Sequence, residues 1–248
     1  MVDGSSTNFA PKIDKKDSEL RPAFKTFLAL ALASISVVTF GDTSPALAAQ
    51  QTPEEAKIEK FRQGFLDDEI APTIKPKGYD VTIVEYMDYQ CPFCRASLQP
   101  IKQLLAQDKK VRIIFRDWPI FGPASERAAR LAIASQWQGK HTAFHDALLT
   151  TPQPLTELKI KTAAKKAGVD WPRLEKDLKT RASDVEALLK RNNDQAEALG
   201  LEGTPGFIIG DVLSFGGMNL AALQKAVKSA RQSSGKPKKL VSQRPEGI

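Results

Sequence analysis

The chain has 248 residues, a net charge of +7 and a hydrophobic fraction of 42%, with two cysteines and two histidines. This composition is ordinary for a globular protein, and the positive charges are spread along the expected helices rather than grouped with aromatic side chains. Neither a nucleic-acid partner nor a cofactor is therefore expected. The cysteines lie three positions apart. A bridge across so short a loop constrains the unfolded chain little, which excludes structural stapling as their main task.

The first 48 residues have the three parts of a secretory signal peptide. The basic residues Lys15, Lys16, Arg21 and Lys25 precede an apolar stretch, Phe27–Phe40, and the small-residue sequence Ala46-Leu47-Ala48 follows it. The apolar stretch has 14 residues, fewer than the ~20 that span a bilayer. Cleavage before Ala49 is the prediction, and an uncleaved membrane anchor is the alternative. Either way the rest of the chain faces an oxidising space, where a disulfide persists.

The first part of the remaining chain is predicted to alternate between helices and strands. A short helix from Thr52 to about Leu66 and a linker occupy residues 49–75. Apolar and β-branched residues make Val81–Met87 a buried strand. Arg95–Gln107 is predicted to be a helix, and Val111–Phe115 a second strand.

Helical spacing dominates from Ser125 to Leu201, where proline and glycine breaks indicate four or five helices. The predicted core positions of these helices are Leu131, Trp137, Phe144, Leu148, Leu158, Leu174, Leu188, Leu189 and Leu199. A β-hairpin over 206–215 with its turn at Asp211, and a closing helix over 220–231, complete the predicted elements. Residues 232–248 are basic and rich in Ser, Gly and Pro, which predicts a disordered tail.

The chemistry is carried by Cys91-Pro92-Phe93-Cys94, at the junction between the first long strand and its helix. At a helix start, free backbone N–H groups and the helix dipole stabilise an anion, so a thiol there loses its proton easily. The pair is predicted to be a thiol–disulfide redox centre. Cys91 is expected to be the exposed, low-pKa thiol that forms a mixed disulfide with a substrate. Cys94, one turn further in and more buried, is expected to resolve that mixed disulfide.

Three segments in this order resemble the DsbA-like thiol–disulfide oxidoreductases of bacterial envelopes, which have the thioredoxin fold. They are Val84–Cys94, the sequence Phe115-Arg116-Asp117-Trp118-Pro119, and Gly203-Thr204-Pro205-Gly206-Phe207. The resemblance implies an α/β fold, namely a thioredoxin-like domain over residues 76–231. A helical insertion at about 124–201 is expected between the second strand and the cis-proline strand.

The resemblance also implies supporting residues. Pro205 is expected to follow a cis peptide bond beside the cysteines and to leave the backbone of Thr204 free to pair with a substrate strand. Glu85, six residues before Cys91, is expected beneath the active site. A buried carboxyl group there would have a raised pKa and could exchange a proton with the buried thiol. An exposed strand residue is the alternative for Glu85.

Two positions depart from the best-known oxidase of this family. The dipeptide between the cysteines is Pro92-Phe93, where that oxidase has Pro-His. Without the histidine the Cys91 thiolate should be less stable and the disulfide less oxidising. Thr204 is more similar to the residue found in disulfide isomerases. The resemblance therefore indicates the fold more clearly than the direction of electron flow.

His141 and His145, spaced i, i+4 on a predicted helix, are the two histidines of the chain. This spacing can bind zinc, and with Cys91 and Cys94 it would complete a Cys₂His₂ set. The cysteine and histidine halves are too far apart in sequence for a zinc finger. We therefore expect surface histidines over Phe144, and no metal site.

Together these features predict an enzyme of the bacterial periplasm that donates disulfides to unfolded or partly folded exported proteins. A quinone-linked membrane partner is the expected reoxidant. The alternatives are a disulfide isomerase or reductase kept reduced by a membrane donor, and a copper- or zinc-binding protein. Because residues 49–75 offer one short helix for oligomerisation, a monomer is expected.

Overall fold

The computed structural model describes residues 63–233 and 241–243. Its strands are β1 (Thr73–Ile74), β2 (Val81–Met87), β3 (Val111–Asp117), β4 (Gly206–Ile209), β5 (Val212–Phe215) and β6 (Val241–Gln243). Its helices are α2 (Pro92–Gln107), α3 (Pro123–Ser135), the short 3₁₀ helix η1 (Gln136–Gln138), α4 (His141–Thr150), α5 (Glu157–Lys166), α6 (Trp171–Thr180), α7 (Ala182–Ala198) and α8 (Leu220–Ser233). Within these ranges no helix is both long and apolar enough to cross a membrane.

The described start of the chain is the end of a helix, because residues 63–66 are helical. The predicted beginning of that helix at Thr52 and the signal peptide over residues 1–48 both lie outside the described residues.

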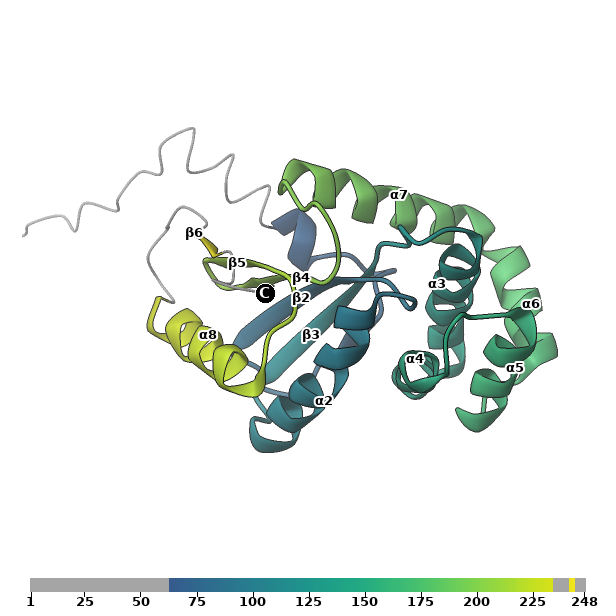
Figure 1. Ribbon diagram of the computed structural model, residues 1–248, viewed down its shortest axis with the longest axis horizontal. Helices are drawn as coiled ribbons and strands as arrows, with labels where there is room; N and C mark the ends of the chain where they lie inside the picture. The colour runs from purple at the N-terminus through teal and green to yellow at the C-terminus, as the bar shows by residue number, and fades with distance from the viewer. Residues whose placement is uncertain (1–62, 234–240, 244–248) are drawn as a thin grey trace, which may run out of the picture. The chain divides into compact units, whose positions relative to one another are not determined.

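The strands form one sheet in the order β1-β3-β2-β4-β5-β6 (Figure 1). β2 and β3 are parallel, and α2 supplies the crossover that a parallel pair requires. β4 runs antiparallel to β2 and forms the predicted hairpin with β5. Tyr86 pairs with Gly206. The chain just before β4 therefore lies at the end of the sheet where β2 ends and the turn to α2 begins.

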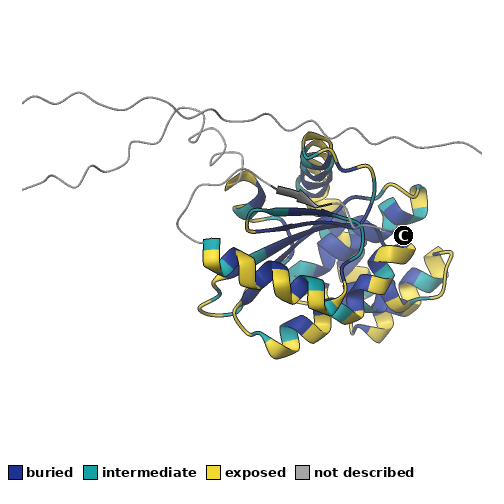
Figure 2. Cartoon of the chain, turned by 60° about the vertical axis from the view of Figure 1, so that its left-hand side comes forward, coloured by how far each residue is buried: buried dark blue, intermediate teal, exposed yellow. Residues whose placement is uncertain are grey.

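Helices cover both faces of the sheet (Figures 1 and 2). On one face, α2 and α8 pack on alternate strand residues such as Ile83, Ile113 and Phe207. The residues between them in sequence, Val84 and Ile114 among them, belong to a second cluster shared with α7. This alternation follows from the two-residue period of a strand. The central strands β2, β3 and β4 are buried almost throughout, while the outer faces of the helices are exposed (Figure 2).

Five α-helices, α3–α7, separate β3 from β4, which confirms the predicted helical insertion. α4 contacts α2, so the insertion packs beside the helix that begins at the cysteines. Leu131, Phe144 and Leu148 are fully buried core residues, as predicted. Leu158 is 75% exposed, contrary to the prediction. The buried face of α5 passes through Ile160, Ala163 and Ala164 instead.

A buried ion cluster ties the first described residues to the sheet and to α7. Asp68 accepts from Arg116 Nη1 at 2.7 Å and from both Nε and Nη2 of Arg191. The Arg116 side chain is 0% exposed, whereas that of Arg191 is 43% exposed. Arg116 also donates to the Phe65 carbonyl at 2.7 Å. A buried guanidinium requires such partners, and Asp68 supplies the compensating charge.

The predicted disordered tail over 232–248 differs from the structure in two places. α8 continues to Ser233, and Val241–Gln243 form β6, which pairs in parallel with β5. Without β6, the backbone N–H and C=O groups along one side of β5 would have no strand partner, and pairing satisfies them. The other residues of that tail lie outside the described ranges.

Candidate active site

A tight turn between β2 and α2 positions the cysteines. The Cys91 N–H donates to the Asp88 carbonyl at 3.2 Å, and the Cys91 carbonyl accepts from Arg95 N–H at 3.1 Å. Pro92 takes the first helical position, where a missing N–H costs nothing. Cys91 is therefore the N-cap residue of α2, as the sequence predicts.

The Cys91 sulfur is surrounded by groups that favour its thiolate. The Cys94 thiol, the Thr204 side chain and the backbone N–H groups of Cys94 and Phe93 stabilise the thiolate form and lower the Cys91 pKa from 9.0 to about 6, although burial acts in the opposite direction. In the thiol form, Sγ donates to the Thr204 carbonyl at 3.1 Å.

The prediction that Cys91 is exposed is wrong, since its side chain is 1% exposed. The sulfur turns inward toward the Thr204 carbonyl, and both Thr204 and Pro205 are buried beside it.

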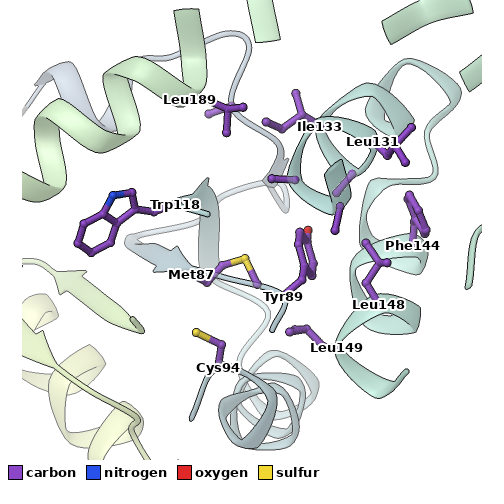
Figure 3. Close-up of a cluster of buried hydrophobic side chains, with 14 of the residues drawn as sticks. Met87, Tyr89, Cys94, Trp118, Leu131, Ile133, Phe144, Leu148, Leu149 and Leu189 are labelled. Atoms are coloured by element: carbon purple, nitrogen blue, oxygen red, sulfur yellow. The ribbon is translucent and has the colours of Figure 1, made fainter. Parts of the chain in front are cut away.

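Cys94 has the opposite acidity. It is fully buried in the first turn of α2. Burial is the main cause that raises its pKa well above the ordinary range, and the hydrogen bond to Cys91 and the nearby Glu85 add to it. Cys94 belongs to the apolar cluster that also contains Met87, Tyr89, Phe144 and Leu148 (Figure 3). At neutral pH the pair therefore consists of one thiolate and one thiol.

The Thr204–Pro205 bond is cis, as expected. The Thr204 hydroxyl is buried and has no hydrogen-bond partner among the described residues. When Cys91 loses its proton, it no longer donates to the Thr204 carbonyl, and the Thr204 hydroxyl can then donate a hydrogen bond to the thiolate. A second cis bond, Gln153–Pro154, lies between α4 and α5 and was not predicted.

Both residues of the inter-cysteine dipeptide are exposed, and Phe93 is 50% exposed. A loop after β3 adds two further exposed apolar side chains, Ile120 at 41% and Phe121 at 49%. Since Gln90 Nε2 donates to the Phe121 carbonyl at 3.2 Å, this loop is attached to the residue just before Cys91. An apolar surface therefore adjoins the buried thiolate.

Glu85 is 1% exposed, which excludes the alternative of an exposed strand residue. Its neighbours across the sheet are Phe115 on β3 and Phe207 on β4. Burial between these rings, together with the nearby Asp117, raises the pKa of Glu85 to about 8. Glu85 Oε2 accepts no hydrogen bond from the described residues. The side chain lines a cavity of about 350 Å³ between α2 and α4, which also reaches His145.

The histidines are not on the surface, contrary to the prediction. His141 and His145 are 6% and 3% exposed, and both rings lie against Phe115. Burial lowers the pKa of His145 to about 4, and it also holds the pKa of His141 well below the ordinary value. His145 Nδ1 is 3.2 Å from the Tyr89 hydroxyl. The sequence prediction failed because the packing of α4 against the sheet could not be read from helical spacing.

The described residues contain no group of three or more His, Cys, Asp or Glu side chains arranged to hold a metal ion. The structure thus does not bring the two histidines and the two cysteines into one site.

Two buried acids near the cysteines were not identified from the sequence. Asp117, at the end of β3, is 1% exposed, and burial raises its pKa to about 7. Asp88 is equally buried and accepts three hydrogen bonds. The role of Asp88 could have been predicted, because an Asp side chain often accepts a hydrogen bond from the backbone N–H two residues later, here that of Gln90, in an Asx turn. For Asp117 the sequence offered no such indication beyond its place in the segment Phe115-Arg116-Asp117-Trp118-Pro119.

The chain matches the sequence model of the DSBA-like thioredoxin domain over residues 82–228. A thioredoxin-like oxidoreductase from Silicibacter pomeroyi DSS-3 is 36% identical, covers 70% of this chain and 99% of that chain, and superposes with a TM-score of 0.66. The thiol–disulfide exchange protein alpha-DsbA2 from Wolbachia pipientis is 32% identical, covers 71% of this chain and 94% of that chain, and has the same TM-score of 0.66.

Similar sequences occur inside larger proteins. A Na⁺/H⁺ antiporter, NhaA 3 of Salinispora tropica, is 30% identical over 157 residues, which are 62% of this chain and 24% of the antiporter. The chain thus spans about a quarter of the length of the first relatives it matches. The probable disulfide bond formation protein D of Bacillus anthracis is 26% identical over 160 residues, 59% of this chain and 72% of that protein. Because the family model covers more than half of its length and the paired thiols are in place, the chain belongs to the DSBA-like thioredoxin domain family of thiol–disulfide oxidoreductases.

Proposed function

We propose that this enzyme donates disulfides to exported proteins through Cys91 and Cys94. A client thiolate attacks Sγ of Cys91 in the Cys91–Cys94 disulfide, and that bond breaks as a mixed disulfide forms. A second client thiolate attacks the client sulfur of the mixed disulfide, and Cys91 leaves as a thiolate. Two electrons pass from the client thiols to the cysteine pair, which a quinone-linked membrane partner would then reoxidise.

The acidity of Cys91 is the observation that carries this direction. A pKa of about 6 makes Cys91 a thiolate at neutral pH. A stable thiolate favours the reduced form of the pair and is a good leaving group, so the disulfide form is an oxidant. An isomerase or reductase is the alternative direction, since Thr204 stands where the resemblance favours one.

Glu85 supports the first step as a proton donor. Cys94 must leave as a thiol because burial disfavours its thiolate. With a pKa of about 8, Glu85 carries a proton at neutral pH, and it is close enough to influence the acidity of Cys94. The cavity beside it offers water a route to restore that proton.

The proposed setting is the bacterial periplasm, reached by means of the signal peptide predicted for residues 1–48. A periplasmic thioredoxin-like protein from Salmonella enterica, 26% identical with a TM-score of 0.61, supports this location. The proposed clients are unfolded or partly folded chains, because the apolar side chains beside Cys91 suit extended apolar segments. A monomer is proposed for the enzyme.

The equilibrium of the Cys91–Cys94 pair with reduced and oxidised glutathione tests the direction. We expect a reduction potential between about −120 and −200 mV, above the value of about −270 mV for thioredoxin. Oxidation of a reduced, unfolded client by the disulfide form should follow. A potential near that of thioredoxin would transfer the protein to the reductase or isomerase class.

Single-cysteine variants test the roles of the two thiols. Cys94→Ser should accumulate mixed disulfides between Cys91 and client proteins, because the resolving thiol is absent. Cys91→Ser should accumulate none. Mapping the adducts by mass spectrometry after trapping with acid reveals which cysteine is attached, and adducts on Cys94 alone would reverse the assignment.

A further inference from the structure

A closed ring of hydrogen bonds lies directly behind the turn that carries Cys91. Asp88 Oδ1 accepts from Gln90 N–H at 2.7 Å and from Ser125 Oγ at 2.7 Å, and Asp88 Oδ2 accepts from Phe121 N–H at 3.0 Å. Gln90 Nε2 closes the ring by donating to the Phe121 carbonyl at 3.2 Å and to Ser125 Oγ at 3.1 Å. The ring joins the Cys91 turn, the loop after β3 and the first turn of α3.

The Asp88 carboxylate is the centre of this ring. Its side chain is buried, as is Ser125, and three donors from three chain segments point at its two oxygens. An ionised carboxylate accepts at both oxygens, whereas an asparagine amide has one oxygen and presents N–H donors on the other side. Substitution of Asp88 by Asn would therefore place the amide N–H₂ group against one of the donors that now bond to the carboxylate.

The ring bears on Cys91 through the backbone. Asp88 and Cys91 are the first and last residues of one turn, closed by the Cys91 N–H···O=C Asp88 bond of 3.2 Å. That turn sets the orientation of Cys91 at the start of α2. The orientation in turn aims Sγ at the N–H groups of Phe93 and Cys94 and at Thr204, the groups that favour the thiolate.

We propose that Asp88 is a positioning residue for the reaction: its carboxylate holds the turn that keeps the Cys91 sulfur against the N-terminus of α2. The proposal rests on the proposed function, in which Cys91 is the thiol that forms the mixed disulfide with a client. The proposal predicts the direction in which the Cys91 pKa changes when the Asp88 charge is removed, because that removal has two opposing effects. Loss of a nearby negative charge alone would lower the Cys91 pKa, whereas loss of the turn geometry raises it.

The test is the pKa of Cys91 in the reduced full-length protein, followed by the ultraviolet absorbance of the thiolate. The pH dependence of alkylation, with the modified cysteine identified by peptide mass, is measured in parallel. Asp88→Asn should raise the Cys91 pKa by about one pH unit, tenfold in the thiol–thiolate equilibrium. Ser125→Ala keeps the carboxylate charge and removes one donor, and should produce a smaller rise. It also keeps the test decisive if Asp88→Asn does not fold.

Asp68→Asn is the matched control. Asp68 is another buried multiply bonded carboxylate, and it belongs to the Arg116 cluster instead of the ring. It should lower the melting temperature without moving the Cys91 pKa. A fall in the Cys91 pKa in Asp88→Asn would overturn the proposal in favour of a purely electrostatic role. An unchanged Cys91 pKa in both ring variants, with lower melting temperatures, would overturn it in favour of a purely structural role. If the acidic thiol maps to Cys94 in the unsubstituted protein, the assignment of the nucleophile fails and the proposal with it.

Discussion

At the scale of single residues, the chemistry depends on the difference in acidity between two thiols of one helical turn. Cys91 has its pKa lowered to about 6, while that of Cys94 is raised well above the ordinary range. The helix N-terminus contributes to the first shift and burial causes the second. Because both sulfurs are almost fully buried, the few polar groups around Cys91 have a large effect on it.

Thr204→Val should raise the Cys91 pKa. Valine keeps the shape of the side chain and removes the hydroxyl, which lowers this pKa in the unsubstituted protein. Thr204→Ser retains the hydroxyl and should leave the Cys91 pKa nearly unchanged. Titration of the thiolate absorbance compares the three proteins. Equal pKa values for the Val and Ser variants would show that the hydroxyl does not act on the thiolate.

Phe93→His should lower the Cys91 pKa and raise the reduction potential together. The side chain of Phe93 is half exposed, so a histidine there can approach the thiolate without a burial penalty. A shift of roughly 30 mV corresponds to ~1.4 kcal/mol for this two-electron couple, so one new hydrogen bond is measurable against glutathione. Phe93→Leu serves as the apolar control. A potential unchanged in Phe93→His would show that the dipeptide does not set it.

At the scale of elements, the hairpin that follows the cis-proline bond depends on close contact with α8. Gly210 in the β4–β5 turn has φ +58°, and a Cβ atom built on it would lie 2.7 Å from the Ala230 Cβ on α8. α8 covers the same face of the sheet as α2. The turn glycine therefore permits the helix to approach the hairpin.

Gly210→Ala should destabilise the protein more than Gly200→Ala, by about 1–3 kcal/mol. Both glycines have positive φ, and Gly200 at +70° has no atom within 4 Å of a built Cβ. The backbone cost is common to the two variants, so their difference isolates the contact with α8. Urea unfolding of each variant gives the two free energies. Equal losses would mean that α8 moves away at little cost.

At the scale of the whole molecule, burial of titratable groups makes stability depend on pH. Glu85 and Asp117 have raised pKa values of about 8 and about 7, so above their ordinary pKa values the folded state holds protons that the unfolded chain has released. Stability from these groups falls as pH rises toward those values. The two buried histidines act in the opposite direction below pH 6.5, because they stay neutral when folded.

The oxidised protein should therefore lose about 1 kcal/mol of stability between pH 7 and 8, mainly through Glu85. Oxidation removes the titration of Cys91, which would otherwise oppose this loss. Glu85→Gln should lose clearly less stability over the same interval, because the amide does not titrate and Asp117 contributes the smaller part of the slope. Urea unfolding at several pH values measures both slopes. Parallel slopes for the two proteins would show that Glu85 does not titrate in this range.

Much of the fold follows from short-range patterns in the sequence. The junction of Val81–Met87 with the cysteines, the hairpin with its turn at Asp211 and the several helices after β3 depend on periodicity, turn residues and helix breaks, which are local properties. The position of Cys91 as N-cap of α2 is local as well. The cis bond before Pro205 was inferred from the family resemblance, and local patterns do not indicate it.

Tertiary structure alone decided the surroundings of these elements. Cys91 is buried because the Thr204 loop, more than 100 residues away in sequence, packs on it at 3.1 Å. Likewise the raised pKa of Glu85 depends on its burial between the neighbouring strands, where Phe115 and Phe207 are its partners. The burial of His145 depends on the packing of α4 against the sheet. Periodicity specifies which side of an element is apolar, but not which distant segment covers it. Desolvation and hydrogen bonding, which set the pKa values of the site, depend on that second choice.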